Sequence, residues 1–150
     1  MFDGQYLFPK SCSLNRLNFS GQFAVSRLLR LHHLVEHQCS DVIHFTGSCY
    51  LGDTGQLECM LQTEGCLRLI CQRCLEPLDW DFTEKSFFVL VSDEKQLPDF
   101  NDESMDCDWL VVDNSLDILE VIQDEILLAL PLAPKHASID CLTQLTQHID

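Results

Sequence analysis

Basic residues are scarce in this chain of 150 residues, because nine Lys and Arg face 24 Asp and Glu, and the formal net charge is −15. Proteins that hold nucleic acid through its phosphates need clustered lysine and arginine. The charge therefore argues against DNA and against a broad RNA-binding face. It favours a protein partner or a small local contact with RNA, since a negative surface steers a protein toward basic partners.

Long apolar runs are also missing. No run reaches the about 18 residues that a membrane helix needs, and Met1 to Gln5 carry neither a basic region nor a long apolar region of a secretory signal. The sequence therefore predicts a cytoplasmic protein with no membrane contact. In that compartment the nine cysteines are expected to be reduced thiols rather than a disulfide framework.

Catalytic signatures are absent as well. The chain has no Gly-rich phosphate loop, no Gly-x-Ser-x-Gly and no His-Glu-x-x-His. Asp and Glu are plentiful, but nothing in their spacing pairs two of them for acid–base chemistry. We therefore expect a binding protein and not an enzyme.

Two segments have the periodicity of amphipathic helices. In residues 21–37, Ala24, Leu28 and Leu31 recur at helical spacing, and Ser20 is a suitable N-cap. The second helix is expected over about residues 116–130, begun by a cap at residue 114 or 115 and ended by Pro131. His32, His33 and His37 fall near the end of the first segment, where cationic side chains suit a helix C-terminus.

Residues 40–91 have the pattern of a β-sheet. Strands are expected over 41–51, 57–62, 66–71 and 78–91, with turns at 53–55 and 63–65, and residues 109–112 form a further short strand. The acidic run 92–108 is expected to be a flexible loop. With 46% hydrophobic residues, we predict one α+β domain spanning residues 1–150. It consists of an antiparallel sheet of about five strands with two packed helices.

A pair of cysteines carries the clearest chemistry. Cys71 and Cys74 are three residues apart at the end of a predicted strand, and a tight turn there can bring both sulfurs to one metal ion. His136 and Cys141, just beyond the second helix, are the candidates for the remaining two ligands of a zinc site. The alternative is a buried structural Cys71 and a partly exposed Cys74. A thioredoxin-like redox role fits poorly, because Pro77 leads into another strand rather than a helix.

Glu125 is placed unusually, in the middle of the apolar stripe of the second helix. A carboxylate on a buried face needs a partner. We therefore hypothesise an ion pair with Arg73 or Arg68, because a guanidinium binds a carboxylate through two parallel hydrogen bonds. The alternative is a slightly rotated helix, which leaves Glu125 at the edge of the stripe.

Three stretches together resemble one family. They are residues 69–77 (LICQRCLEP), residues 124–131 (DEILLALP), and Pro134-Lys135-His136 followed by Cys141. In this order and spacing, over about residues 66–141, the chain is similar to the YceD family of bacterial and plastid proteins. Within these stretches the resemblance marks Arg73, Pro77, Glu125 and Pro131 as structural or interaction residues.

The resemblance implies an accessory role in the synthesis, processing or stability of 23S rRNA, with large-subunit assembly intermediates or ribosomal proteins as partners. Whether the RNA itself is contacted stays open. Some relatives carry a second Cys-x-x-Cys near the C-terminus, which favours zinc, although this chain has His136 and Cys141 there. The alternatives are a zinc-stabilised or redox-sensing binding module and an RNA-processing enzyme.

Overall fold

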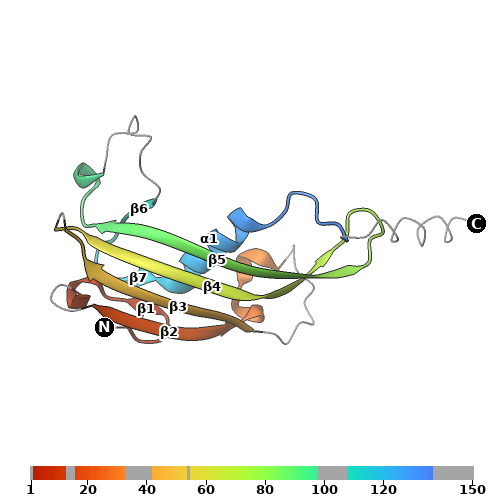
Figure 1. Ribbon diagram of the computed structural model, residues 1–150, viewed down its shortest axis with the longest axis horizontal. Coiled ribbons are helices and arrows are strands. Elements are labelled where there is room, and N and C mark those ends of the chain that lie inside the picture. The colour runs from red at the N-terminus through yellow and green to blue at the C-terminus, as the bar shows by residue number, and fades with distance from the viewer. Residues whose placement is uncertain (1, 13–15, 33–41, 54, 98–107, 137–150) are drawn as a thin grey trace, which may run out of the picture.

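The computed structural model describes residues 2–12, 16–32, 42–53, 55–97 and 108–136. Within them, a five-stranded sheet has the order β2-β3-β4-β5-β6, and β1 and β7 form a separate antiparallel pair (Figure 1). The strands are β1 Tyr6–Leu7, β2 Leu17–Ala24, β3 Val42–Leu51, β4 Leu57–Ile70, β5 Pro77–Val91, β6 Asp108–Val111 and β7 Leu116–Asp117. The helix α1 is Ile118–Ala129, and the 3-10 turns are η1 Pro9–Cys12, η2 Val25–Arg27, η3 Leu29–Leu31 and η4 Glu94–Gln96.

Strands β2 to β5 form an antiparallel meander, as the alternating sequence of this region predicts. The turn between β3 and β4 lies where Asp53-Thr54-Gly55 indicated it. Gly55 has a φ of +82°, a conformation that glycine adopts without strain, and the Gly52 amide donates to the Gln56 carbonyl at 2.7 Å. The prediction of an α+β chain with a five-stranded sheet is therefore confirmed in its main part.

Helix α1 lies across one face of the sheet and closes the core (Figure 1). Ile118, Ile122 and Ile126 are buried at helical spacing on the inner side of α1. They complete a cluster with alternate sheet residues, among them Phe45 and Leu61. Each such side chain contributes roughly 1.5–3 kcal/mol through burial, so the position of α1 on the sheet is strongly determined.

The helix begins about two residues later than the sequence pattern indicates. Asp117, rather than residue 114 or 115, is the N-cap, because its carboxylate accepts from the Leu119 amide at 3.1 Å. The predicted end is confirmed. Leu130 leaves the helical conformation directly before Pro131, as the steric effect of a proline on its predecessor requires.

The prediction of a helix over 21–37 is wrong for the residues that the structure describes. Residues up to 24 belong to β2, and residues 33–37 lie outside the described part of the chain. Val25, Leu28 and Leu31 are buried in or beside two 3-10 turns, where every third residue returns to the same side. The spacing of three therefore reflected this tighter geometry and not an α-helix.

Ser20 consequently lies in a strand and is not a helix cap. The two-helix architecture is corrected in the same way, because α1 is the single α-helix of the described residues. Of the three histidines expected near the helix end, His32 follows the 3-10 turn η3, and its Nε2 lies 2.9 Å from the Ser26 carbonyl oxygen. His33 and His37 lie outside the described residues.

Two features of the sheet also differ from the prediction. Residues 63–65 are not a turn, because β4 runs through them without a break and Thr63 is buried. Gly65 instead makes room for a neighbour, since a Cβ there would lie 2.7 Å from Ile43 Cδ1. The last strand, β6, pairs with β5 in parallel, so the sheet is mixed rather than purely antiparallel. Most of the predicted acidic loop 92–108 lies outside the described residues.

Candidate metal centre

The turn between β4 and β5 presents the two cysteines of the Cys-x-x-Cys motif. Cys71 directly follows β4 and is fully buried, and Cys74 is buried at the far side of the turn. The Cys71 amide donates to the Glu76 carbonyl at 2.9 Å, and the Leu75 amide donates back to the Cys71 carbonyl at 2.9 Å. These two bonds close a tight loop that turns both thiols toward the same space.

Leu75 shows that this loop is held under local strain. Its φ is +64°, and it is the one non-glycine residue with a positive φ in the described part of the chain. A side chain in this region costs of order 1–3 kcal/mol, and such strain persists where surrounding contacts impose it. The contacts that accompany this conformation are the two backbone hydrogen bonds of the turn, one of which is donated by the Leu75 amide itself.

The segment after α1 returns to this turn, and backbone contacts hold it there. The Gln72 amide donates to the Pro134 carbonyl at 2.7 Å, and Arg73 donates through Nη2 to the His136 carbonyl. Arg73 therefore fastens the segment that carries His136. These contacts join residues that lie more than 60 positions apart in the chain, since Arg73 and His136 are 63 apart.

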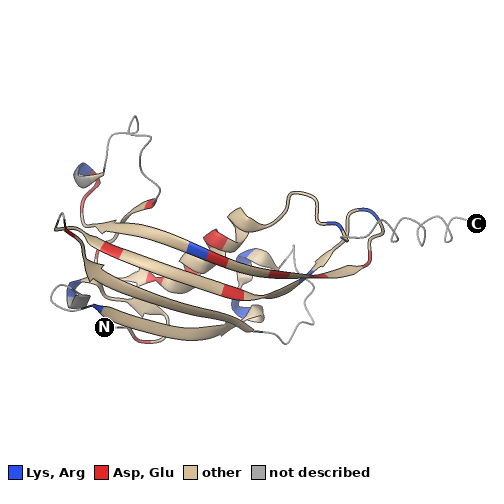
Figure 2. Cartoon of the chain, in the orientation of Figure 1, with Lys and Arg blue, Asp and Glu red and all other residues tan. Residues whose placement is uncertain are grey.

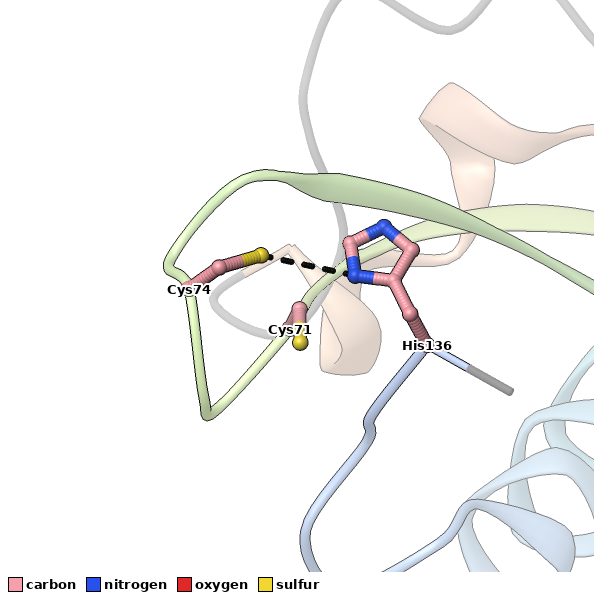
Figure 3. Close-up of side chains that lie close together, drawn as sticks. All are labelled: Cys71, Cys74 and His136. Atoms are coloured by element: carbon pink, nitrogen blue, oxygen red, sulfur yellow. Dashed lines mark hydrogen bonds between the residues drawn. The ribbon is translucent and has the colours of Figure 1, made fainter. Parts of the chain in front are cut away.

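His136 completes the cluster. Its Nε2 lies 3.2 Å from the Pro77 carbonyl oxygen and its Nδ1 lies 3.4 Å from Cys74 Sγ. The ligand atoms of Cys71, Cys74 and His136 all lie within 4.8 Å of one another (Figure 3). A carbonyl only accepts hydrogen bonds, so the proton of a neutral ring belongs on Nε2 and the lone pair of Nδ1 faces the sulfurs. Ligating histidines are commonly oriented in this way by a backbone carbonyl.

The backbone of the turn also prepares Cys71 for ligation. Burial raises the pKa of the Cys71 thiol, but backbone hydrogen bonds from Cys74, His136 and Arg73 outweigh it and lower this pKa to about 5. The thiolate is the form that binds metal ions. Two thiolates and one imidazole nitrogen are a donor set that suits zinc, which takes four such ligands in structural sites. The residues present therefore fit the metal that the motif predicts.

Of the four predicted ligands, the structure brings together three. Cys141 lies outside the described residues. Pro77 begins β5 and supplies the carbonyl that orients His136. Pro131 ends α1 and lines an apolar hollow with Leu130 and Pro134 beside the cysteine turn.

The predicted ion pair between Glu125 and Arg73 is wrong. Glu125 is half-buried and accepts a hydrogen bond of 2.6 Å from the Ser86 hydroxyl, whereas Arg68 pairs with Asp79 at 3.3 Å. The distance along β5 explains the error. Ser86 is nine residues from Pro77 at the start of the strand, which corresponds to about 30 Å of extended chain. An arginine in the cysteine turn cannot reach the middle of α1.

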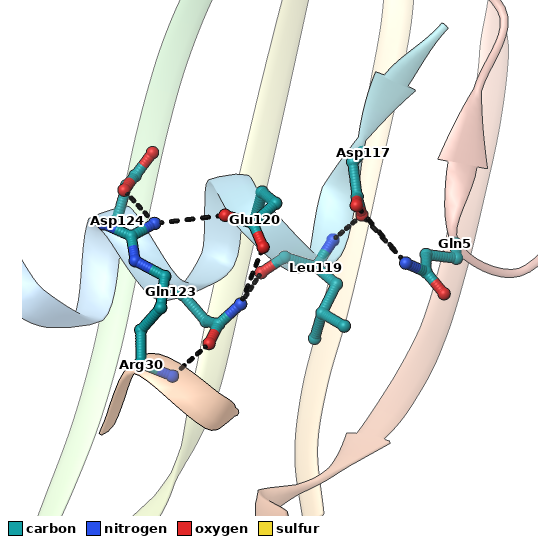
Figure 4. Close-up of polar contacts among 7 residues, drawn as sticks. All are labelled: Gln5, Arg30, Asp117, Leu119, Glu120, Gln123 and Asp124. Atoms are coloured by element: carbon teal, nitrogen blue, oxygen red, sulfur yellow. Dashed lines mark hydrogen bonds and ion pairs between the residues drawn. The ribbon is translucent and has the colours of Figure 1, made fainter. Parts of the chain in front are cut away.

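A second polar cluster, which no motif of the sequence indicates, lies between η3 and α1. Gln123 is only 2% exposed, and its Oε1 accepts from the Arg30 amide at 3.0 Å (Figure 4). The Arg30 side chain lies 2.5 Å from Asp124 and 3.3 Å from Glu120. These contacts bind η3 to α1. No spacing in the sequence indicates these contacts, because Arg30 of η3 and Gln123 of α1 are 93 positions apart.

Charge is distributed unevenly over the described residues. Acidic side chains occur along β4, β5 and α1, and the few basic ones lie mainly at turns and ends (Figure 2). None of the helices in the described residues is long and apolar enough to cross a membrane.

Comparisons with known proteins agree with the motifs. A family model described as large ribosomal RNA subunit accumulation protein YceD matches residues 60–148, which is more than half of the chain and includes the cysteine turn and His136. A Haemophilus influenzae protein of the same description is 29% identical over 137 residues, covering 89% of this chain and 75% of that protein. No solved structure matches the chain significantly.

Proposed function

The chain belongs to the YceD family, and on this premise we propose that it supports accumulation of 23S rRNA as an accessory factor in assembly of the large ribosomal subunit. The family match carries the proposal, because it spans more than half of the chain and includes the residues of the cysteine turn. The proposed place of action is the cytoplasm, where the ribosome is assembled.

The proposed mode of action is binding rather than catalysis. The family is named for an effect on the amount of an RNA and not for a reaction. The net charge of −15 disfavours a broad hold on RNA phosphates and favours contact with the basic proteins of the assembling particle. An assembly intermediate or a ribosomal protein is therefore the proposed partner.

Deletion and complementation test this function. Cells that lack the protein should contain less 23S rRNA relative to 16S rRNA, and expression of the full chain should restore the ratio. An unchanged ratio in the deletion strain would refute the proposal. Incubation of the purified protein with a 23S precursor tests the competing enzyme, since specific cleavage or modification would replace an accessory role by a catalytic one.

We also propose that Cys71, Cys74 and His136 hold a structural zinc ion, with Cys141 as the fourth ligand. Zinc would supply a cross-link between the exit of α1 and the end of the β4–β5 hairpin. Arg73 and Pro77 position His136 for this role through their contacts with its carbonyl and its ring. The connection from the cysteine turn into β5, rather than into a helix, supports a structural site over a thioredoxin-like redox site.

Metal analysis of protein purified without chelator tests the site. A filled structural site should contain near one zinc per chain, and less than about 0.2 per chain would refute it. The variant Cys74→Ser should lose most of the metal. Cys66→Ala is the matched control, because Cys66 is a half-buried cysteine of β4 outside the cluster, and it should retain the zinc.

A further inference from the structure

A groove opens between α1 and the β6 edge of the sheet, away from the cysteine turn. It has a volume of about 460 Å³ and takes its lining from α1, β5, β6 and η3. We call it the α1–β6 groove. Strand β6 is the last strand of the sheet within the described residues, so the groove lies at the margin of the fold rather than inside it.

The wall of the groove offers apolar surface to a partner. Leu128 stands at its rim with 79% of its surface exposed, and Leu110 and Leu127 are half-buried beside the core. A single exposed leucine needs no explanation. Three leucines around one concave site, together with the half-buried Trp109, provide an apolar contact of the kind that anchors a side chain of a partner.

The same groove is strongly acidic. Asp108, Asp124 and Glu125 belong to its lining. Asp124 already holds the guanidinium of Arg30 at 2.5 Å, with Glu120 beside it at 3.3 Å (Figure 4). This contact shows that the outer side of α1 binds a guanidinium in the folded protein. Asp108 and Glu125 add two more carboxylates at the same groove, and Arg30 is the one basic residue among the described residues that line it.

We propose that the α1–β6 groove binds a basic segment of a large-subunit protein, with an apolar side chain against Leu110, Leu127 and Leu128 and arginine or lysine against the carboxylates. This inference rests on the proposed function and specifies its partner. Charge complementarity selects a protein over RNA, because the phosphates of RNA would meet like charges at Asp108 and Glu125. The exposed leucines select a segment that is basic and partly apolar.

Site-specific photocrosslinking in growing cells tests the inference with the full chain. The photoreactive residue p-benzoylphenylalanine replaces Leu128 and, as a matched control, Leu51, which is 52% exposed at the end of β3 and does not line the groove. Crosslinks at position 128 to identified Lys- and Arg-rich large-subunit proteins, and none to them at position 51, are expected. Crosslinks to RNA alone, or no difference between the two positions, would overturn the inference.

Charge reversal at the rim provides a second arm. Asp108→Lys should lower the crosslink yield at position 128 by at least about threefold, because a repulsive charge replaces an attractive one at the groove. Asp81→Lys is the control, since Asp81 is an exposed acid on β5 outside the groove, and it should leave the yield unchanged. Equal yields in the two variants would contradict binding through the groove. Thermal unfolding of both variants excludes a loss of fold as the cause.

The two proposals fail in different ways. If the double variant Asp108→Lys, Leu128→Glu restores 23S rRNA fully in the deletion strain and position 128 gives no crosslink, the accessory function stands and the groove inference is refuted. If the deletion itself leaves 23S rRNA unchanged, the accessory function is refuted. The crosslinked proteins at position 128 still decide whether the groove binds a basic segment.

Discussion

Removal of the proposed zinc should destabilise the protein in a way that depends on Cys74. A metal that joins Cys74 to His136 closes a loop between residues 62 positions apart. A cross-link over this length reduces the entropy of the unfolded chain by an amount worth about 4 kcal/mol. That is a large share of the 5–15 kcal/mol typical of a folded domain.

The assay is urea denaturation of the wild-type protein with and without a chelator. Chelation should lower the free energy of unfolding by about 4 kcal/mol, which corresponds to a fall in Tm of roughly 8–16 °C for a chain of this size. Zinc binding to cysteines of the unfolded chain would reduce this difference.

The variants make the reasoning refutable. Cys74→Ser without chelator should resemble the chelated wild type, and chelator should change its stability little. Cys66→Ala should keep the full response to chelator, because Cys66 lies outside the cluster. An equal chelator effect in wild type and Cys74→Ser, or no effect in the wild type, would refute a zinc cross-link at this turn.

Three further predictions concern the same structure. Gln123→Ala should lower the free energy of unfolding by about 1–3 kcal/mol in urea denaturation, since it leaves the Arg30 amide without its acceptor. A change below about 0.5 kcal/mol would show that water replaces the glutamine as the acceptor. Leu75→Gly should leave the stability unchanged or raise it, because glycine relieves the strain of a φ of +64°. Leu51→Gly, a control in a strand, should lower the free energy of unfolding by about 0.5–1 kcal/mol. Similar losses of stability for both variants in thermal unfolding would contradict strain at Leu75. In metal-free protein, the stability advantage of wild type over Cys71→Ser should grow as pH rises from about 5 toward 9.0, because the folded pKa of Cys71 lies below its ordinary value. Below about pH 5 the difference should no longer depend on pH, because the thiol is protonated in both states. A difference that is independent of pH over the whole range in urea denaturation would exclude a lowered pKa.

The cysteine turn and the α1–β6 groove occupy different parts of the fold but share the end of α1. Leu127 lines both the groove and the apolar hollow beside the turn. A zinc cross-link after α1 would therefore also fix the C-terminal part of the helix, which carries Leu127 and Leu128. In this way the proposed zinc would support binding of a partner at the α1–β6 groove without taking part in a reaction.

Local patterns were sufficient for much of the fold. Alternation of apolar and polar residues predicted the β3–β5 region, and helical spacing with a following proline predicted α1. The Cys-x-x-Cys spacing predicted that two thiols face one site, because a tight turn of this length is a local structure. Each of these features is decided by residues that are near neighbours in the chain.

The errors arose where two local patterns coincide. Residues 25, 28 and 31 have a spacing of three that both a 3-10 turn and one face of an α-helix satisfy. Thr63-Glu64-Gly65 has turn-forming residues, yet the pairing of β4 with β3 and β5 carries the strand through them. In the second case the pairing with neighbouring strands outweighed a weak local preference.

The sequence by itself determined most of the β3–β5 region, the helix α1, the acidic character and the two thiols of the site. Only the tertiary structure decided that His136 meets Cys74, that Glu125 lies against Ser86, and that Gln123 is buried against η3. The physical reason is distance along the chain. Periodicity indicates which side of an element is buried. Contacts between residues that are 39 to 93 positions apart in the sequence depend instead on the lengths of β4 and β5 and on where α1 packs on the sheet.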